Sequence, residues 1–412
     1  MFQTISKLQT HLLILALAAG LLFFLKLGTP SLWDIDEGNN AEASREMLET
    51  DNWVVPTFNY ELRVDKPALL YWLQMAAYRM HGINEFSARL PSALAAFAAV
   101  FVLYALGRRM FGPMEGLLAG LILASSVAFC ASAHFANPDA LLNLCAISTL
   151  TLFWLDYSRG ARTWFWTAGI MAGFGVLAKG PVGVILPATV VLVFLLWEKK
   201  LAILRDWRLL GGVLLLALVA VPWYALVGVE TKADFLIGFL LKHNLGRFVE
   251  PMEKHGGSPF YYLFVVLAGF GPWAVFLLST FWFGTGDRAR EHGATLAANR
   301  FLWCWIGVYL LFFSLAGTKL PNYILPLYAP LALLMARFLE RWRTGEFAVV
   351  WPLRVSLICL VLVGVGTSVT FLLVGGALPG DLLRGQYLPG FRYWAGLGAL
   401  PVVTAAGCWF CL

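Results

Sequence analysis

A succession of apolar segments constrains this chain most, because each is close to the length that crosses a bilayer. About 20 consecutive apolar residues in a helix span the hydrocarbon core. By this measure the sequence predicts about twelve transmembrane helices. They lie near residues 8–28, 87–107, 114–133, 138–157, 163–178, 181–197, 209–229, 260–283, 301–317, 322–340, 352–375 and 391–411. The two shortest segments meet at Lys179–Gly180–Pro181, where the boundary between them is least defined.

Composition excludes a soluble globular domain. The chain is 60% hydrophobic and 13% charged, with a mean hydropathy of +0.74, whereas soluble domains are about half apolar and a quarter charged. We therefore expect an all-α integral membrane protein forming one polytopic domain over residues 1–412, without a C-terminal soluble domain. Lys7 precedes the first apolar segment as in a signal peptide, but no small-residue cleavage site follows, so we expect an uncleaved helix.

The basic residues predict the orientation of the chain. The net charge of +6 would suit nucleic acid, but lysine and arginine concentrate in alternate short loops, as the positive-inside rule describes. These loops include Lys7, Arg108, Arg109, Arg159, Arg162, Lys199, Lys200, Arg205 and Arg208. We therefore predict a bacterial inner (plasma) membrane protein with a cytoplasmic N-terminus and no nucleic-acid partner. The loops 29–86 and 230–259 then lie on the extracytoplasmic face.

The loop 29–86 contains the longest polar interval, Leu32–Trp72, and we interpret this loop as the floor of an active site. Carboxylates beside hydrocarbon are costly, so they usually line a water-filled cavity with a function. The spacing of apolar residues predicts an amphipathic helix over Ala41–Glu49 that could lie on the membrane surface. A second helix is predicted after Lys66–Pro67, because proline suits a first helical position.

Three carboxylates are candidate catalytic groups. Asp36 and Glu37 are adjacent, and alone such a pair is more often a solvated turn or a helix cap. Asp139, however, follows Asn137–Pro138 at the outer end of another span. Isolated carboxylates on one face suit general-base catalysis and stabilisation of an oxocarbenium-like centre.

Cations on the same face indicate an anionic ligand. Lys66 lies between Asp65 and the helix-starting Pro67, where an ammonium and a positive helix end together favour a phosphate. Further candidates are Lys179, Arg247, Lys319 and Tyr323. Singly, each is more often an interfacial anchor; together they would form a cationic pocket suited to a lipid phosphate.

The sequence predicts no certain cofactor and no disulfide framework. Asp65, His243 and His255 could bind a divalent metal, although their spacing is not diagnostic. The six cysteines fall inside or at the ends of apolar segments, where cysteine usually behaves as a small hydrophobe.

The ordered motifs resemble one known family. They are Asp36-Glu37, Ala41-Glu42, Ser44-Arg45-Glu46-Met47, Trp53-Val54-Val55-Pro56, Asp65-Lys66-Pro67, Asn137-Pro138-Asp139, Ala178-Lys179-Gly180, His243, Arg247-Phe248 and Lys319-Leu320-Pro321-Asn322-Tyr323-Ile324-Leu325-Pro326. Over residues 1–340 this set resembles the bacterial aminoarabinose (lipid A) transferases and their dolichyl-phosphate-mannose protein mannosyltransferase-like relatives. The chain departs from the aminoarabinose enzymes at Asp65, where they usually have glutamate, and at residues 38–40.

The resemblance implies a GT-C membrane glycosyltransferase that takes a sugar from a polyprenyl phosphate. By this resemblance Asp36 matches the catalytic carboxylate and Asp139 the acid of the second loop. Lys66, Arg247 and Tyr323 match the lipid-phosphate contacts, with Lys179 and Lys319 as further candidates.

The hypothesis is therefore an inverting transferase using an undecaprenyl-phosphate sugar, with lipid A, another glycan or a protein as acceptor. The alternative is a transporter or flippase of polyprenyl-linked sugars, although transporters usually contain internal repeats and we find none here. An inactive scaffold subunit is a third possibility. The donor sugar, the acceptor and the oligomeric state are left open.

Overall fold

The fold comes from a computed structural model of the 412-residue chain, which describes residues 2–32, 35–160, 165–249, 256–286, 293–346, 351–378 and 387–410. The chain forms two compact units. Unit 1 comprises Met1–Gly269 and Glu291–Arg337, and unit 2 comprises Phe270–Arg290 and Phe338–Leu412. This division leaves the expectation of one membrane domain over 1–412 a prediction.

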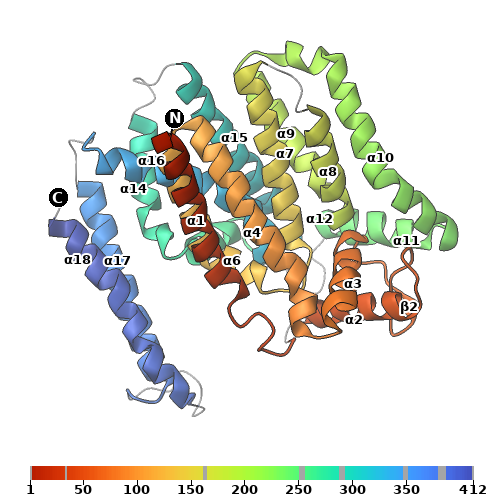
Figure 1. The fold of residues 1–412 in the computed structure, drawn as a ribbon, viewed down its shortest axis with the longest axis horizontal. Coiled ribbons are helices and arrows are strands. Elements are labelled where there is room, and N and C mark those ends of the chain that lie inside the picture. The colour runs from red at the N-terminus through yellow and green to blue at the C-terminus, as the bar shows by residue number, and fades with distance from the viewer. Residues whose placement is uncertain are drawn as a thin grey trace. The chain divides into compact units, whose positions relative to one another are not determined.

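Unit 1 is a helical bundle with a small polar layer at one end (Figure 1). Its first elements are α1 (Phe2–Phe24), α2 (Ile35–Glu49), β1 (Thr57–Phe58), β2 (Glu61–Leu62), α3 (Leu69–His81), α4 (Glu85–Met110), α5 (Pro113–Ser125), α6 (Val127–Ala133) and α7 (Asp139–Arg159). These are followed by α8 (Phe165–Lys179), α9 (Val182–Trp197), the 3₁₀ helix η1 (Leu201–Arg205), α10 (Trp207–Glu230), α11 (Asp234–Ile237), the π-helix η2 (Gly238–Gly246) and α12 (Arg247–Val249). The last are α13 (Tyr261–Gly269), α15 (Gly293–Leu315), the 3₁₀ helix η5 (Pro321–Leu327) and the start of α16 (Tyr328–Arg343).

Unit 2 is also helical. It contains the 3₁₀ helix η3 (Trp273–Phe276), α14 (Leu277–Gly286), the end of α16, α17 (Trp351–Val374), the 3₁₀ helix η6 (Pro389–Gly398) and α18 (Ala399–Phe410). Within this unit, α18 and η6 pack along α17. Ser279 in α14 and Ser356 in α17 share a buried hydrogen bond of 2.8 Å.

The all-α membrane fold is confirmed, but the count of twelve spans is not. Within the described ranges, eight helices are long and apolar enough to cross a membrane, or up to ten if each of two broken pairs is one span. One broken pair is α5 and α6, which bend by 68°. Two predicted spans, α8 and α9, have 15 and 16 residues. At about 1.5 Å per residue they are shorter than the hydrocarbon core is thick.

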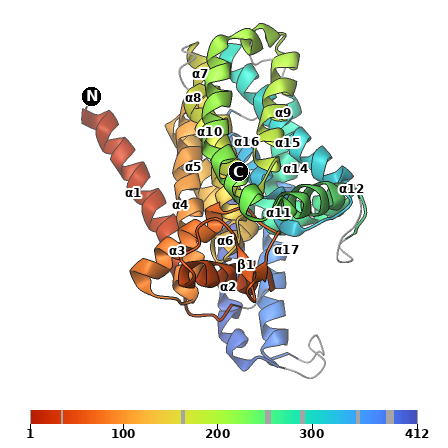
Figure 2. The same ribbon diagram turned by 90° about the vertical axis from the view of Figure 1, so that its right-hand side faces the viewer.

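The described residues of the loop 29–86 fold into a polar layer at one end of unit 1, below the bundle in both views (Figure 1, Figure 2). The helix predicted over Ala41–Glu49 is present but begins earlier, at Ile35, so it includes the first acidic pair. The helix predicted after Lys66–Pro67 begins at Leu69. Between them β1 and β2 form an antiparallel hairpin that pairs Thr57 with Leu62, and the sequence analysis did not anticipate it.

The long helices of unit 1 hold the polar layer and the bundle together. α7 packs between α4 and α8, and α10 packs closely along α8. A Cβ on Gly169 of α8 would overlap the backbone of Gly212 in α10, so the close crossing of these helices requires glycine. As a result, the end of α8 and the start of α7 are fixed beside the polar layer.

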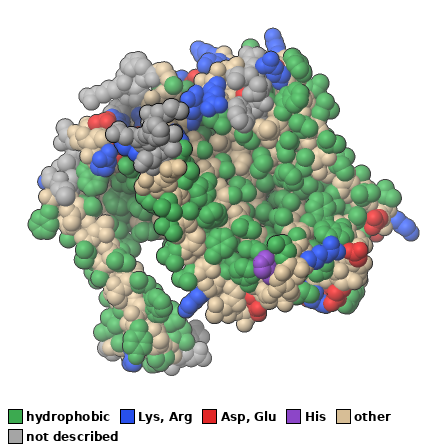
Figure 3. Space-filling model, in the orientation of Figure 1, with side chains coloured by type: hydrophobic (Ala, Val, Ile, Leu, Met, Phe, Trp, Pro, Cys, Tyr) green, Lys and Arg blue, Asp and Glu red, His purple; other side chains and the backbone are tan. Residues whose placement is uncertain are grey.

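The surface of unit 1 separates apolar and charged side chains. Figure 3 shows a wide hydrophobic area over the middle of the unit, with acidic side chains along its lower edge. That edge carries α2, α3 and α11 in the same orientation (Figure 1). The broad apolar surface matches a multi-pass membrane protein, in which hydrocarbon surrounds the middle of the bundle.

Candidate functional site

Asp139 and Lys179 meet at the end of the bundle beside the polar layer (Figure 1). Asp139 is the first residue of α7, where a carboxylate is favoured by the positive helix end. Lys179 is the last residue of α8, and Gly180 with a φ of +82° turns the chain away behind it. The two side chains form an ion pair. Asn322 of η5 donates to the second Asp139 oxygen at 2.5 Å, so this carboxylate is buried and fully engaged.

Lys66 reaches the same region from the polar layer. Its ammonium nitrogen lies 3.9 Å from Asp36 Oδ2. The Lys66 side chain is 10% exposed and that of Asp36 is 52% exposed. The site therefore combines a buried cation with a carboxylate that faces the solvent.

Arg247 and Tyr323 are brought together by backbone pairing between two distant segments. The amides of Gly317 and Thr318 donate to the carbonyl oxygens of Phe248 and Arg247 at 2.8 and 3.0 Å. Arg247 Nη1 then donates to Tyr323 Oη at 3.3 Å. The Lys179 ammonium lies 4.7 Å from the centre of the Tyr323 ring, a cation–π contact.

Asp65 lies between two cationic or potentially cationic groups. His243 Nε2 is 3.1 Å from Asp65 Oδ1, and Arg63 Nη1 is 3.4 Å from Asp65 Oδ2. Two of the three metal candidates are thus in contact, while His255 lies outside the described residues. Within the described ranges no group of three histidine, cysteine, aspartate or glutamate residues is arranged to hold a metal.

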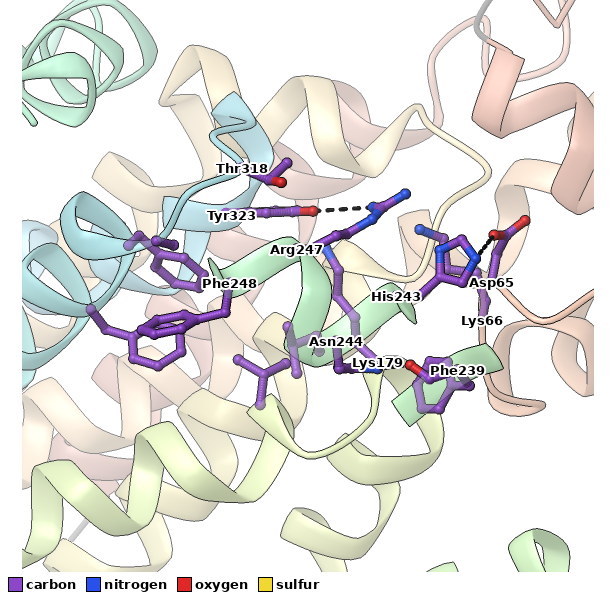
Figure 4. A pocket seen from close by; sticks show the side chains of 15 residues that line it. Asp65, Lys66, Lys179, Phe239, His243, Asn244, Arg247, Phe248, Thr318 and Tyr323 are labelled. Atoms are coloured by element: carbon purple, nitrogen blue, oxygen red, sulfur yellow. Dashed lines mark hydrogen bonds and ion pairs between the residues drawn. The ribbon is translucent and has the colours of Figure 1, made fainter. Parts of the chain in front are cut away.

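These side chains surround a cavity of about 120 Å³. Its polar lining consists of Asp65, Lys66, Lys179, His243, Asn244, Arg247, Thr318 and Tyr323. Its apolar lining includes Leu142, Val182, Phe239, Phe248, Phe312 and Phe313. In Figure 4, Phe248 lies at the opposite end from Asp65 and His243, with Arg247 between them. The cavity therefore has a cationic end and an apolar end.

Burial makes two of these groups easier to deprotonate. Burial lowers the pKa of the Lys66 ammonium, and the nearby Asp36 carboxylate only partly offsets this effect. Burial also lowers the pKa of His243, again with a partial offset from Asp65. An anion placed among these groups would stabilise their charged forms.

Two predicted site residues lie elsewhere. Glu37 was expected to be catalytic, but it is fully buried and binds Arg89 of α4 with both oxygens, at 2.7 and 2.9 Å. Lys319 was expected to bind phosphate, but its ammonium donates to the carbonyl oxygens of Ser314 and Ala316, both at 2.8 Å. In the structure Glu37 joins α2 to α4, and Lys319 caps the end of α15. The catalytic role expected of Glu37 and the phosphate-binding role expected of Lys319 stay predictions.

The sequence analysis missed several residues at the site. Asn322 was quoted within a motif without a role, although an asparagine that follows proline in a short turn could have been flagged. Arg63 is buried and bridges Asp65, Tyr71 and Asn40, the last two at 3.1 and 3.2 Å. No local signal distinguishes Arg63 from an ordinary loop arginine.

Comparison with known proteins identifies relatives along nearly the whole chain. Residues 65–224 match the model of the family described as dolichyl-phosphate-mannose-protein mannosyltransferase. An undecaprenyl phosphate-alpha-4-amino-4-deoxy-L-arabinose arabinosyl transferase of Edwardsiella ictaluri is 30% identical over 96% of this chain and 72% of its own length. The corresponding transferase of Erwinia tasmaniensis is 28% identical over 98% of this chain and 74% of its own length.

A solved structure has the same fold. The crystal structure of ArnT from Cupriavidus metallidurans bound to undecaprenyl phosphate superposes with a TM-score of 0.76 and 26% identity. The match covers 96% of this chain and 69% of that protein. The GT-C fold implied by the sequence resemblance is therefore confirmed.

Proposed function

The chain belongs to the family of undecaprenyl phosphate–aminoarabinose arabinosyl transferases, and from this membership we propose that it is an inverting, polyprenyl-phosphate-sugar-dependent glycosyltransferase. The donor is an undecaprenyl-phosphate sugar, and the acceptor is lipid A, another glycan or a protein. The reaction takes place at the extracytoplasmic face of the bacterial inner membrane. One observation carries the proposal: a cavity with a cationic and an apolar end lies beside a solvent-facing carboxylate.

The cavity suits a lipid phosphate at both ends. Lys66, Lys179 and Arg247 supply positive charge for the phosphate, and the phenylalanine-lined end suits the first isoprene units. As the glycosidic bond breaks, negative charge grows on the departing phosphate oxygen. Cations held in place before the reaction stabilise that charge without reorganising. Asp139 acts as a positioning residue, because its ion pair holds Lys179 in the cavity.

Asp36 is the proposed general base. Its exposure lets an acceptor hydroxyl or amine approach from the aqueous side. Its 3.9 Å distance from Lys66 supports a position beside the proposed phosphate. The acceptor atom attacks the anomeric carbon while Asp36 takes its proton. The bond from that carbon to the phosphate oxygen breaks, and its electrons leave with the polyprenyl phosphate. A single displacement of this kind inverts the anomeric configuration.

The test is release of undecaprenyl phosphate from a panel of undecaprenyl-phosphate sugars by the purified protein in nanodiscs, followed by mass spectrometry. We expect Asp36→Asn to abolish release while the protein stays folded. Asp51→Asn is the matched control, because Asp51 is an exposed aspartate of the same loop whose ion pair with Arg79 is exposed. The sugar that supports release identifies the donor.

Wild-type turnover in Asp36→Asn would refute the assigned base. No release with any sugar, together with movement of sugar-lipids across liposomes, would instead establish the transporter alternative.

A further inference from the structure

We propose that unit 1 binds one acyl chain of an anionic phospholipid in an apolar slot that shares no lining residue with the donor cavity. The slot has a volume of about 300 Å³ and lies among α7, α8, α9, η1 and α10. Among the described residues that line it, Thr149 is the only one with a polar side chain. Apolar cavities of about 150 Å³ stay dry and bind benzene. A slot of twice that size has room for a segment of hydrocarbon chain.

The slot extends from near the donor cavity to the opposite end of the bundle. On α9 it runs from Val184, two residues beyond the donor-cavity residue Val182, to Leu195 near the end of the helix. On α8 it is lined by Phe165, Ala168 and Ala172, whereas α8 reaches the donor cavity only at Lys179. In both ribbon views the turn between α9 and α10 lies at the end of unit 1 remote from α2 and α3 (Figure 1, Figure 2).

The mouth of the slot opens on the membrane-facing surface. Leu192, Leu204 and Val213 line the slot and are exposed. In a bilayer these side chains contact hydrocarbon, so a lipid tail, rather than water, is next to the mouth and can enter the slot.

Charge at the rim selects the headgroup. The α9–η1 turn and η1 carry Lys199, Lys200 and Arg205 beside the slot residue Leu204. Lys200 donates to Tyr157 at 2.8 Å. Lys199 and Arg205 are exposed, and no carboxylate of the described chain pairs with either of them.

The neighbouring acidic groups are already engaged. Glu198 binds Arg300 at 2.7 Å, and Asp206 caps α10 by accepting from the Arg208 amide at 3.0 Å. Trp197 and Trp207 are exposed on either side of the turn, as is common at the lipid headgroup level. Free cations, an aromatic rim and an apolar slot together match a lipid with an anionic headgroup, because basic residues at this depth attract anionic lipids.

The test uses native mass spectrometry of the purified full chain with phosphatidylglycerol and phosphatidylcholine of identical acyl chains. Wild type should retain one phosphatidylglycerol through collisional activation. Ala188→Phe should lose it, because Ala188 lines the slot yet is exposed, so the larger ring can fill the slot without straining the core. Ile185→Phe is the matched control, since Ile185 is an exposed residue of the same helix outside the slot lining.

A second pair of variants tests the headgroup. The double variant Lys199→Gln with Arg205→Gln should bind both lipids equally, losing the preference for phosphatidylglycerol. Lys7→Gln should keep it, because Lys7 lies on α1, which packs on α4, α5 and α6. If Ala188→Phe retained phosphatidylglycerol at the wild-type level, the slot would not be the lipid-binding site. If the wild type bound the two lipids equally, the proposed preference for an anionic headgroup would be wrong. Neither outcome depends on the proposed reaction.

Discussion

Lys66 is a buried cation whose charge depends on its surroundings. Burial lowers the pKa of its ammonium, and Asp36 recovers only part of the loss. The charged form exists below this pKa and is lost as the pH rises through it. A lysine in this position therefore loses its charge at a lower pH than an exposed lysine, unless a bound phosphate restores it.

The lowered pKa of Lys66 predicts that the affinity of the protein for undecaprenyl phosphate falls as the pH is raised above neutrality. The phosphate has its second pKa at about 6, so its own charge is constant over this range. Lys66→Arg should bind more weakly near neutrality, because the geometry of arginine differs, but should keep its affinity to a higher pH. Lipid binding measured from pH 7 to pH 10 checks both curves.

Parallel curves for wild type and Lys66→Arg would contradict the assignment, since the loss would then arise from another group. The curve for Asp51→Asn should follow wild type, because Asp51 pairs with Arg79 at the surface and lies outside the cavity lining.

At the scale of elements, polar contacts hold α2 against the bundle more than apolar packing does. Its buried residues include Glu37, Asn40 and Ser44, which follow a helical repeat. Glu37 also accepts from the Ala136 amide at 3.0 Å, and Asn40 donates to the Ala136 carbonyl at 3.1 Å. Arg89, besides binding Glu37, donates to the carbonyl oxygens of Leu27, Pro30 and Ser31. These bonds join α2 and α4 to the segment that follows α1 and to Ala136, between α6 and α7.

Glu37→Gln should therefore destabilise the protein by about 3 kcal/mol. Removing one member of a buried ion pair leaves the other charge uncompensated, and the remaining carbonyl acceptors of Arg89 keep the loss at the lower end of the usual range. Unfolding by detergent titration measures the change. Asp36→Asn is the natural control: it removes a half-exposed carboxylate from the adjacent position, so its stability should match wild type.

An unchanged unfolding free energy in Glu37→Gln would contradict the structural role. A folded Glu37→Gln protein without turnover would return Glu37 to the catalytic set.

At the scale of the whole molecule, the functional groups divide between the two ends of unit 1. The donor cavity and the polar layer lie at one end, and the basic α9–α10 turn lies at the other (Figure 1). The positive-inside rule predicts that this turn is cytoplasmic and that the donor cavity is extracytoplasmic. An extracytoplasmic site gives the proposed reaction access to envelope acceptors.

This orientation predicts opposite labelling of two engineered cysteines in a background with all six native cysteines replaced by serine. Glu61→Cys, in the exposed β2, should react with a membrane-impermeant maleimide in intact spheroplasts. Arg205→Cys should react only after permeabilisation. The reverse pattern would place the active site in the cytoplasm.

The sequence alone predicts that this is a membrane protein and identifies many residues of the candidate site. Apolar length is a local property, so the predicted apolar segments coincide with helices of the described chain. The count of twelve spans is not confirmed, because α8 and α9 are shorter than a span and two helix pairs, such as α5 and α6, are broken. The motifs likewise marked Lys66, Lys179, Arg247 and Tyr323, which do line one cavity.

Only the tertiary structure shows that residues which look equivalent in the sequence have different surroundings. Asp36 and Glu37 are neighbours, yet successive side chains on a helix point about 100° apart, so one faces solvent and the other meets Arg89. Lys179 and Lys319 both follow apolar spans, but Lys319 lies beside the carbonyl groups that end α15. Glu37 and its partner Arg89 are 52 residues apart, so which partner such a charge finds depends on a distant segment and is decided only once the helices have packed.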